Sequence, residues 1–263
     1  MKECTYCGGT LKDNRNKCPF CGREYEGKGF VSFALSEEAV PEKTSREEES
    51  LGDAIKAVTN ATVHLSGIYN AMREDGSVSA EEISATGFFV EENGNKYIVT
   101  VAHFTDKVIE RKGAMFANFP QSVLDTKDAF SVYPLVVDNM NDVSLIGMDL
   151  PAPEKTEILR LESRSSVDQG DSVITVGCPG HINFIHNKGT VALTSLADSP
   201  FSISKILCDL NTTHGNSGGA VVRMKDRAVI GMVKGAFEGT PNHTVCVAAD
   251  AIKQLIYAYE RNS

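Results

Sequence analysis

The sequence has no apolar run of membrane-spanning length, and Met1–Cys4 begins no stretch of the signal-peptide type. Cysteine is scarce outside the N-terminal region, where four of the seven lie. The other three, Cys178, Cys208 and Cys246, are an odd number, which does not suit a disulfide framework. We therefore expect a reduced, cytoplasmic protein without a membrane segment, in which these three thiols are small core residues.

An excess of positive charge is also missing. The chain carries 26 Lys and Arg against 35 Asp and Glu, a formal charge of −9. A protein that binds duplex nucleic acid usually presents a clustered basic face, because contacts with phosphates supply much of the affinity. Nucleic-acid binding is therefore the weaker hypothesis for the chain as a whole.

Two Cys-x-x-Cys pairs stand near the N-terminus, Cys4 with Cys7 and Cys18 with Cys21, and ten residues separate them. Two residues between cysteines make a tight turn that aims both sulfurs at one ion, and a glycine after each pair relieves that turn. Four thiolates form a closed tetrahedral Zn²⁺ site, which is structural because no coordination position is left open. A disulfide pair or a redox Cys-x-x-Cys is the alternative, although neither needs the duplication.

The segment 1–28 resembles a small zinc ribbon, and its thin core implies that folding depends on one bound zinc ion per chain. Zinc ribbons often suggest nucleic acid. Here six basic side chains stand against four acidic ones, and the resulting +2 is cancelled by the −2 of a zinc tetrathiolate. A protein-docking or structural role for the ribbon is therefore the stronger hypothesis.

The segment 29–50 is acidic and poor in apolar residues, and we expect an extended linker. Within it, Phe30–Leu35 could add a strand to the ribbon or dock on the domain that follows, with local packing favoured. Residues 45–59 become amphipathic at helical spacing and lead into a strand over Thr62–Tyr69.

The loop Gly215–Gly219, of sequence Gly-Asn-Ser-Gly-Gly, places a serine between glycines. A hydroxyl becomes a nucleophile when a base takes its proton and N–H donors hold the oxyanion that its attack creates. Because glycine has no Cβ, the N–H groups of Gly215 and Ser217 can point to one spot while a substrate approaches closely. A simple Gly/Ser hairpin loop is the alternative unless a histidine and an acid accompany Ser217.

His103 ends a buried, β-branched run, Lys96–His103, that is typical of a strand. Another strand, Thr86–Glu92, precedes it, and Asn93-Gly94 between them is a strong hairpin signal because both turn positions favour φ > 0. We expect His103 at the end of a rigid hairpin, where a general base can be positioned. Each of the five other histidines is more typical of a packed or solvated residue.

Asp142 stands at the head of an alternating strand, Val143–Ile146. An aspartate next to a buried strand can accept the imidazole N–H and fix its tautomer. Asp138 is the nearest competitor, and an ordinary turn aspartate is the alternative for both. The chain order His103, Asp142, Ser217 is the order of the chymotrypsin-like double barrel among the folds that carry such a triad.

Seven blocks of the sequence occur in a familiar order: Ala54–Val58, Thr86–Phe88, Thr100–His103, Asp142–Ile146, Gly170–Pro179, Lys188–Val191 and Gly215–Val222. On these blocks the chain from 51 to 263 resembles a trypsin-like serine protease of the HtrA (DegP-like) branch. The resemblance implies a mostly β fold of two six-stranded barrels. The sequence agrees with this fold, because it shows short strands broken by Gly, Pro and Asn and no long helix. We place barrel one at about 61–150 and barrel two at about 165–249, followed by a helix near Asp250–Tyr257.

The resemblance implies a serine endopeptidase that works through an acyl-enzyme. His103 is then the general base, Asp142 its orienter, Ser217 the nucleophile, and the amides of Gly215 and Ser217 the oxyanion hole. The usual HtrA tail of peptide-binding domains is missing, which argues against the chaperone and cage behaviour of that family. The alternative is a protease-fold adaptor with vestigial activity, whose ribbon recruits a protein or nucleic-acid partner.

The resemblance also suggests a substrate pocket. Its floor in the trypsin fold lies six residues before the nucleophile, and here that residue is the uncharged Asn211. Val233 and Ala236 supply small apolar walls. Such a pocket would remove water from a charged substrate side chain without offering it an opposite charge. We therefore expect cleavage after Ala, Val or Leu. Lys234 and His214 lie close enough in sequence to the rim to admit an acidic or polar residue instead.

Overall fold

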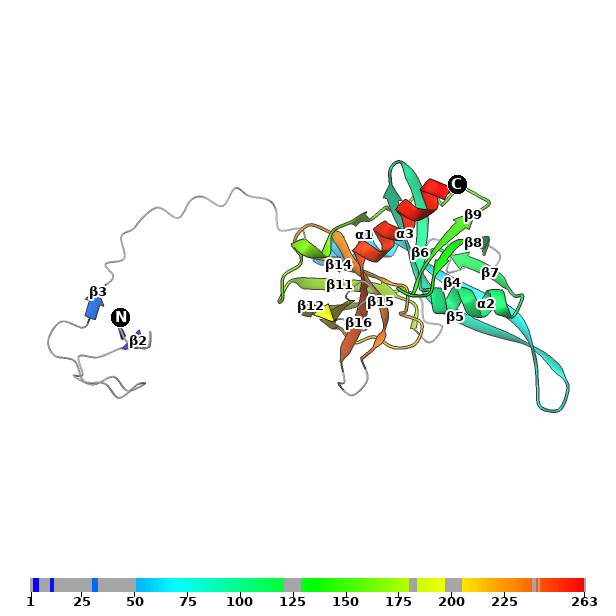
Figure 1. Ribbon diagram of the computed structural model, residues 1–263, viewed down its shortest axis with the longest axis horizontal. Coiled ribbons are helices and arrows are strands. Elements are labelled where there is room, and N and C mark those ends of the chain that lie inside the picture. The colour runs from blue at the N-terminus through cyan, green and yellow to red at the C-terminus, as the bar shows by residue number, and fades with distance from the viewer. Residues whose placement is uncertain are drawn as a thin grey trace. The chain divides into compact units, whose positions relative to one another are not determined.

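The computed structural model describes the backbone of residues 2–4, 10–11 and 30–32. It also describes residues 51–262 apart from 121–128, 180–183, 197–204, 238–239 and 241. The chain divides into two compact units, Met1–Glu48 and Glu49–Ser263 (Figure 1). None of the described helices is both long enough and apolar enough to cross a membrane.

The N-terminal unit contains a small antiparallel sheet. Its strands are β1 (Lys2–Cys4), β2 (Thr10–Leu11) and β3 (Phe30–Ser32), in the order β2-β1-β3. β3 pairs with the strand that carries Cys4, so part of Phe30–Leu35 adds a strand to this unit, and the sheet extends into the segment predicted as linker. Cys7, Cys18 and Cys21 lie outside the described residues, and the zinc ribbon stays a prediction.

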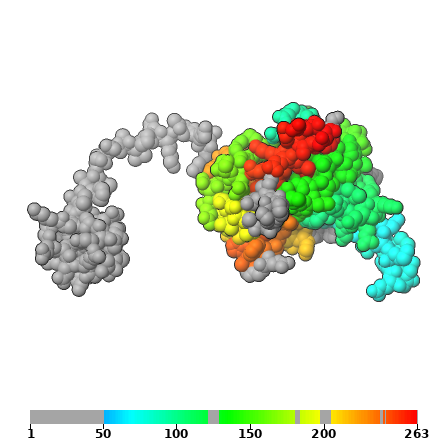
Figure 2. Space-filling model, viewed as in Figure 1, coloured from blue at the N-terminus to red at the C-terminus, as the bar shows by residue number. Residues whose placement is uncertain are grey.

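Barrel one closes on itself in the order β4-β5-β6-β9-β8-β7. Its strands are β4 (Thr62–Met72), β5 (Val78–Glu92), β6 (Asn95–Thr100), β7 (Ala114–Asn118), β8 (Phe130–Asp138) and β9 (Val143–Met148). The β5–β6 hairpin turns at Asn93 and Gly94 with φ of 52° and 82°, which confirms the turn predicted from this dipeptide. The far end of the β4–β5 hairpin projects beyond the barrel (Figures 1 and 2).

Barrel two is a ring of six strands in the order β15-β14-β11-β12-β13-β16, closed by pairing between β15 and β16. These strands are β11 (Ser172–Gly177), β12 (Ile185–Leu196), β13 (Lys205–Asp209), β14 (Ala220–Arg223), β15 (Ala228–Ala236) and β16 (His243–Ala248). A short strand, β10 (Arg160–Leu161), joins β15 in parallel, and a 3₁₀ turn, η1 (Arg164–Ser166), follows it. The prediction of a mostly β, two-barrel fold is confirmed.

Helices flank the barrels at both ends of this unit. α1 (Leu51–Ala61) precedes barrel one and buries Ala54 and Val58, and the C-terminal helix, α3 (Ala249–Asn262), follows barrel two directly. Tyr97 of β6 donates a hydrogen bond to Glu260 of α3 at 2.9 Å, so the helix also contacts barrel one. The predicted C-terminal helix is therefore confirmed, and it is longer than the sequence suggested.

One helix was not predicted. α2 (Ala102–Glu110) begins two residues after β6 ends at Thr100, so His103 lies in the first turn of a helix and not at the tip of a strand. The β-branched residues before His103 are typical of a strand, so the sequence did not indicate that a helix begins there. α2 buries Phe104 and Val108 against β4, where a Cβ on Gly67 would lie only 2.3 Å from Cγ2 of Val108. A glycine in the strand thus makes room for the helix that carries His103.

The core continues from one barrel into the other. The interior of barrel one, one side of barrel two and α3 form a single apolar cluster, whereas the interior of barrel two forms a smaller one. Cys208 and Cys246 belong to the smaller cluster, and Cys178 is also fully buried. The two barrels are therefore packed as one body within this unit, and residues at their junction can hold a fixed geometry.

Candidate active site

Three chain segments supply the residues of the proposed triad. β6 and β9 are antiparallel neighbours with Thr100 opposite Ser144, so the end of β6 lies beside the start of β9. His103 follows the first strand end, and Asp142 precedes the second. The third residue, Ser217, lies in the loop between β13 and β14 of barrel two.

His103 and Asp142 are in direct contact. Nδ1 of His103 lies 3.1 Å from Oδ1 and 3.0 Å from Oδ2 of Asp142, and the backbone N–H of His103 donates to Oδ1 at 3.0 Å. Asp142 itself has a φ of 61°, a left-handed conformation that short polar residues tolerate. One carboxylate thus holds both the imidazole ring and the backbone of His103, leaving Nε2 as the ring nitrogen that can take a proton.

The surroundings of Asp142 keep it ionised. Burial raises the pKa of this carboxyl, but the hydrogen bonds and charge of His103, together with the charge of Lys234, outweigh burial and lower the pKa. Nζ of Lys234 lies 3.9 Å from Oδ2. Asp138 has a different role, because its carboxylate accepts the backbone N–H groups of Met140 and Asn141 and caps that turn.

Ser217 is near this pair but is not hydrogen-bonded to it. Its hydroxyl donates to the carbonyl oxygen of Lys234 at 3.0 Å. The structure therefore brings His103 and Asp142 together and leaves the Ser217 hydroxyl on another acceptor. The Ser217 hydroxyl would have to give up this acceptor before its proton could pass to His103.

The loop around Ser217 is a tight turn that depends on glycine. Gly215 has a φ of 96°, and a Cβ there would lie 2.4 Å from the carbonyl oxygen of Cys178. Asn216 N–H donates back to Thr213 at 3.0 Å, which closes the turn. Within the described part of the chain, the N–H groups of Gly215 and Ser217 have no hydrogen-bond partner, as donors reserved for an oxyanion would require.

A cavity of about 530 Å³ opens beside His103. It is lined by His103, Leu196, Lys205, Lys234, Gly235, Ala236, Phe237 and Val245. Of the three residues predicted for the substrate pocket, only Ala236 lines it. Val233 is fully buried in the core of barrel two, and Asn211 is exposed outside the cavity lining. Strand alternation turns Val233 to the barrel interior and not toward this cavity, and the predicted substrate pocket stays a prediction.

A family model described as a trypsin-like peptidase domain matches residues 85–232, more than half of the chain. The chain belongs to the trypsin-like peptidase family. Among solved structures, the HtrA-type protease AlgW with a decapeptide matches this chain with a TM-score of 0.67 and 14% sequence identity. That match covers 81% of this chain and 67% of the other. No curated protein matches the chain.

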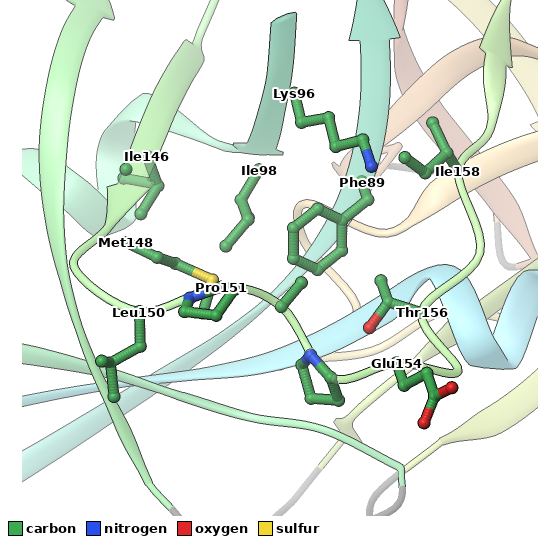
Figure 3. Close-up of a pocket in the computed structure, with 13 residues that line it drawn as sticks. Phe89, Lys96, Ile98, Ile146, Met148, Leu150, Pro151, Glu154, Thr156 and Ile158 are labelled. Carbon is green, nitrogen blue, oxygen red and sulfur yellow. The ribbon is translucent and has the colours of Figure 1, made fainter.

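The trypsin-like peptidase domain has a second cavity, of about 460 Å³ (Figure 3). Phe89, Ile98 and Met148 line it from barrel one, and the crossover segment 150–158 covers the opposite side. Figure 3 shows these mainly apolar side chains around one space. None of the three proposed triad residues lines this cavity.

Two further residues of the candidate site were not predicted as site residues, although Thr86 belongs to one of the seven ordered sequence blocks. Lys205 begins β13, and its side chain is almost completely buried in the cavity beside His103. Burial, and next the charge and hydrogen bond of Lys234, lower the pKa of Lys205 to about 8, while the charge of Asp142 opposes this shift. Thr86 of β5 contacts the Ser217 loop from the other barrel. Both placements follow from long-range strand pairing, which local patterns do not encode.

Proposed function

We propose that the protein is a serine endopeptidase that hydrolyses peptide bonds through an acyl-enzyme on Ser217. The observation that carries the proposal is the direct contact between His103 and Asp142 in a trypsin-like peptidase domain whose glycine-rich loop holds Ser217. The match to an HtrA-type protease favours that branch of the family. The substrate is accordingly a protein or peptide.

In the proposed reaction, the Ser217 hydroxyl leaves the carbonyl of Lys234 and turns to Nε2 of His103. His103 takes the proton while the oxygen attacks the scissile carbonyl, and Asp142 stabilises the imidazolium that forms. The amides of Gly215 and Ser217 hold the oxyanion of the tetrahedral intermediate. The intermediate collapses to the acyl-enzyme, and His103 returns the proton to the leaving amine. A water molecule, deprotonated by His103, then hydrolyses the ester and restores Ser217.

The cavity beside His103 is our candidate for substrate side-chain binding. Leu196, Ala236 and Val245 give it apolar walls, and two lysines, Lys205 and Lys234, also line it. Apolar walls favour small or medium aliphatic side chains, and the amino groups disfavour lysine and arginine by repulsion and desolvation. Small aliphatic residues before the scissile bond therefore remain the proposed preference.

The N-terminal unit is proposed to be a structural zinc ribbon. Its donor set, Cys4, Cys7, Cys18 and Cys21, fits Zn²⁺, because two Cys-x-x-Cys turns supply four thiolates and leave no open position. Zinc would supply the folding energy that so small a unit lacks. We propose a docking role toward a protein partner, and a reduced compartment such as the cytoplasm, where these thiols stay free to bind metal.

A second candidate function is an adaptor with a vestigial protease fold, and one observation favours it. The Ser217 hydroxyl is bonded to Lys234 and not to His103. The two functions are separated by incubating the purified full-length chain with a peptide library, with Ser217→Ala as the control. Cleavage by the wild type and none by the variant supports the endopeptidase, and no cleavage by either supports the adaptor.

A further inference from the structure

Thr86 connects barrel one to the loop of the nucleophile. It lies in β5, is completely buried, and all of its polar groups are hydrogen-bonded. Its N–H donates to the carbonyl oxygen of Ser217 at 2.8 Å, and its hydroxyl donates to that of Gly215 at 2.7 Å. The same hydroxyl accepts the N–H of Cys178 at 3.0 Å, and the Thr86 carbonyl accepts the hydroxyl of Thr100 at 2.7 Å.

These contacts leave the Thr86 side chain no free rotation. A hydroxyl that both donates and accepts in a buried site has one orientation, since any other leaves a buried polar group without a partner. The backbone fit is equally close, because a Cβ on Gly218 would lie 1.9 Å from the Thr86 carbonyl oxygen. The loop of barrel two is therefore held against a rigid strand of barrel one.

We propose that Thr86 is a positioning residue for catalysis, and that its hydroxyl fixes the oxyanion-binding amides from the opposite barrel. Two hydrogen bonds of Thr86, one from its hydroxyl and one from its backbone N–H, hold the carbonyl groups of Gly215 and Ser217. The N–H groups of these two residues form the proposed oxyanion hole. Fixing the carbonyl of Gly215 restricts rotation about this flexible residue, whose φ of 96° only glycine adopts freely. This inference rests on the proposed endopeptidase function.

The test compares Thr86→Val with Thr86→Ser. Valine keeps the shape of threonine but has no hydroxyl, whereas serine keeps the hydroxyl and loses one methyl group. With a peptide substrate, Thr86→Val should lower kcat by about 100-fold, because misplacement of catalytic groups by about 1 Å has that effect. KM should stay within about threefold, since the lost interaction acts in the transition state. Thr86→Ser should restore kcat to within about threefold of the wild type.

A matched control separates positioning from loss of stability. Thr62 in β4 is also completely buried, and its hydroxyl donates to the carbonyl of Val58 in α1 at 2.7 Å. Thr62→Val therefore removes a comparable bond and should lower the melting temperature without a selective loss of kcat. If Thr86→Val does not fold, Thr86→Cys replaces it. The thiol is a weak donor, so kcat should again fall below that of Thr86→Ser.

The outcomes distinguish the positioning role from the endopeptidase function itself. If the wild type hydrolyses peptides and Thr86→Val keeps its kcat, the positioning role is wrong and the endopeptidase stands. Equal losses of kcat in Thr86→Val and Thr86→Ser would also overturn the role of the hydroxyl. If the wild type has no activity that depends on Ser217, the endopeptidase proposal fails, and the positioning role fails with it.

Discussion

The hydroxyl of Ser217 donates to the carbonyl oxygen of Lys234 at 3.0 Å, while the side chain of Lys234 reaches within 3.9 Å of Asp142. One residue of β15 therefore contacts both the proposed nucleophile, through its backbone, and the proposed orienting acid, through its charge. Under the proposed mechanism, Ser217 exchanges the Lys234 carbonyl for His103 before it attacks the substrate.

Asp142→Asn should lower kcat strongly, by up to about 10⁴-fold, because an amide favours the wrong imidazole tautomer. Asp138→Asn is the matched control, since Asp138 caps a neighbouring turn and does not contact His103. Steady-state kinetics of both variants on one peptide check the assignment. Equal losses in the two variants would show that Asp142 acts only through the local fold.

The N-terminal cysteines and the barrel cysteines should differ in reactivity. Elemental analysis should find one zinc per chain, and chelation should expose four reactive thiols, Cys4, Cys7, Cys18 and Cys21. The other three are buried in the peptidase unit, and burial raises the pKa of the Cys178 thiol to about 11, so they should react only after unfolding. The peptidase unit should stay folded without metal.

Cys7→Ser and Cys18→Ser should each release the zinc. A chain without zinc, or one whose barrels melt when the metal is chelated, would contradict the prediction of a separate structural site.

Lys205→Met should stabilise the protein at neutral pH. The pKa of Lys205 falls from 10.5 to about 8 on folding, mainly through burial and then through Lys234. Between about pH 8 and pH 10.5 the unfolded chain binds more protons than the folded chain, so the free energy of unfolding of the wild type rises with pH. The cost of burying the charged form of Lys205 is fully present below about pH 8. The advantage of the variant should therefore be largest at pH 7 and should shrink toward pH 10.5.

Urea unfolding at pH 7 and pH 10 measures this difference. Lys225→Met is the control, because Lys225 is exposed and pairs with Asp171 at 2.9 Å. A stability difference between Lys205→Met and the wild type that does not change with pH would show that the charge of Lys205 carries no folding cost.

Cleavage of a peptide library should occur mainly after Ala, Val or Leu. The cavity beside His103 has apolar walls, and Lys205 and Lys234 should exclude lysine and arginine from it. The profile is read by mass spectrometry of the products, with Ser217→Ala as the blank. Cleavage mainly after basic residues would contradict the predicted preference and leave the endopeptidase function intact. Cleavage after acidic residues would show that the two lysines decide specificity.

The sequence predicts the fold wherever local chemistry or an ordered set of motifs decides it. Asn93-Gly94 specifies its hairpin because both residues tolerate positive φ, and the short strands predict two barrels. The helix α2 was not predicted because the β-branched residues of β6 continue to Val101, and Val101 provides no side-chain cap to mark the start of a helix. The sequence could therefore propose His103 but not the element that carries it.

The candidate site is less predictable because it depends on pairing between distant segments. The bond between Thr86 and Gly215 joins residues 129 positions apart, and only the packing of one barrel on the other creates it. The position of Val233 also depends on pairing between distant strands. A register irregularity follows Val233 in the pairing of β15 with β16. The sequence placed Val233 and Ala236 together in a pocket, whereas the strand turns Val233 into the core.

Labelling with a fluorophosphonate probe shows whether Ser217 is a nucleophile that His103 activates. The probe reacts covalently with an activated serine, and mass spectrometry of peptides then locates the adduct. Ser217→Ala should give no adduct, and His103→Ala should label about 10⁴–10⁶-fold more slowly than the wild type, as expected when triad residues act as a unit. A single adduct on Ser217 of the wild type is the predicted result, and a wild-type chain that remains unlabelled, or labels as fast without His103, would contradict the account.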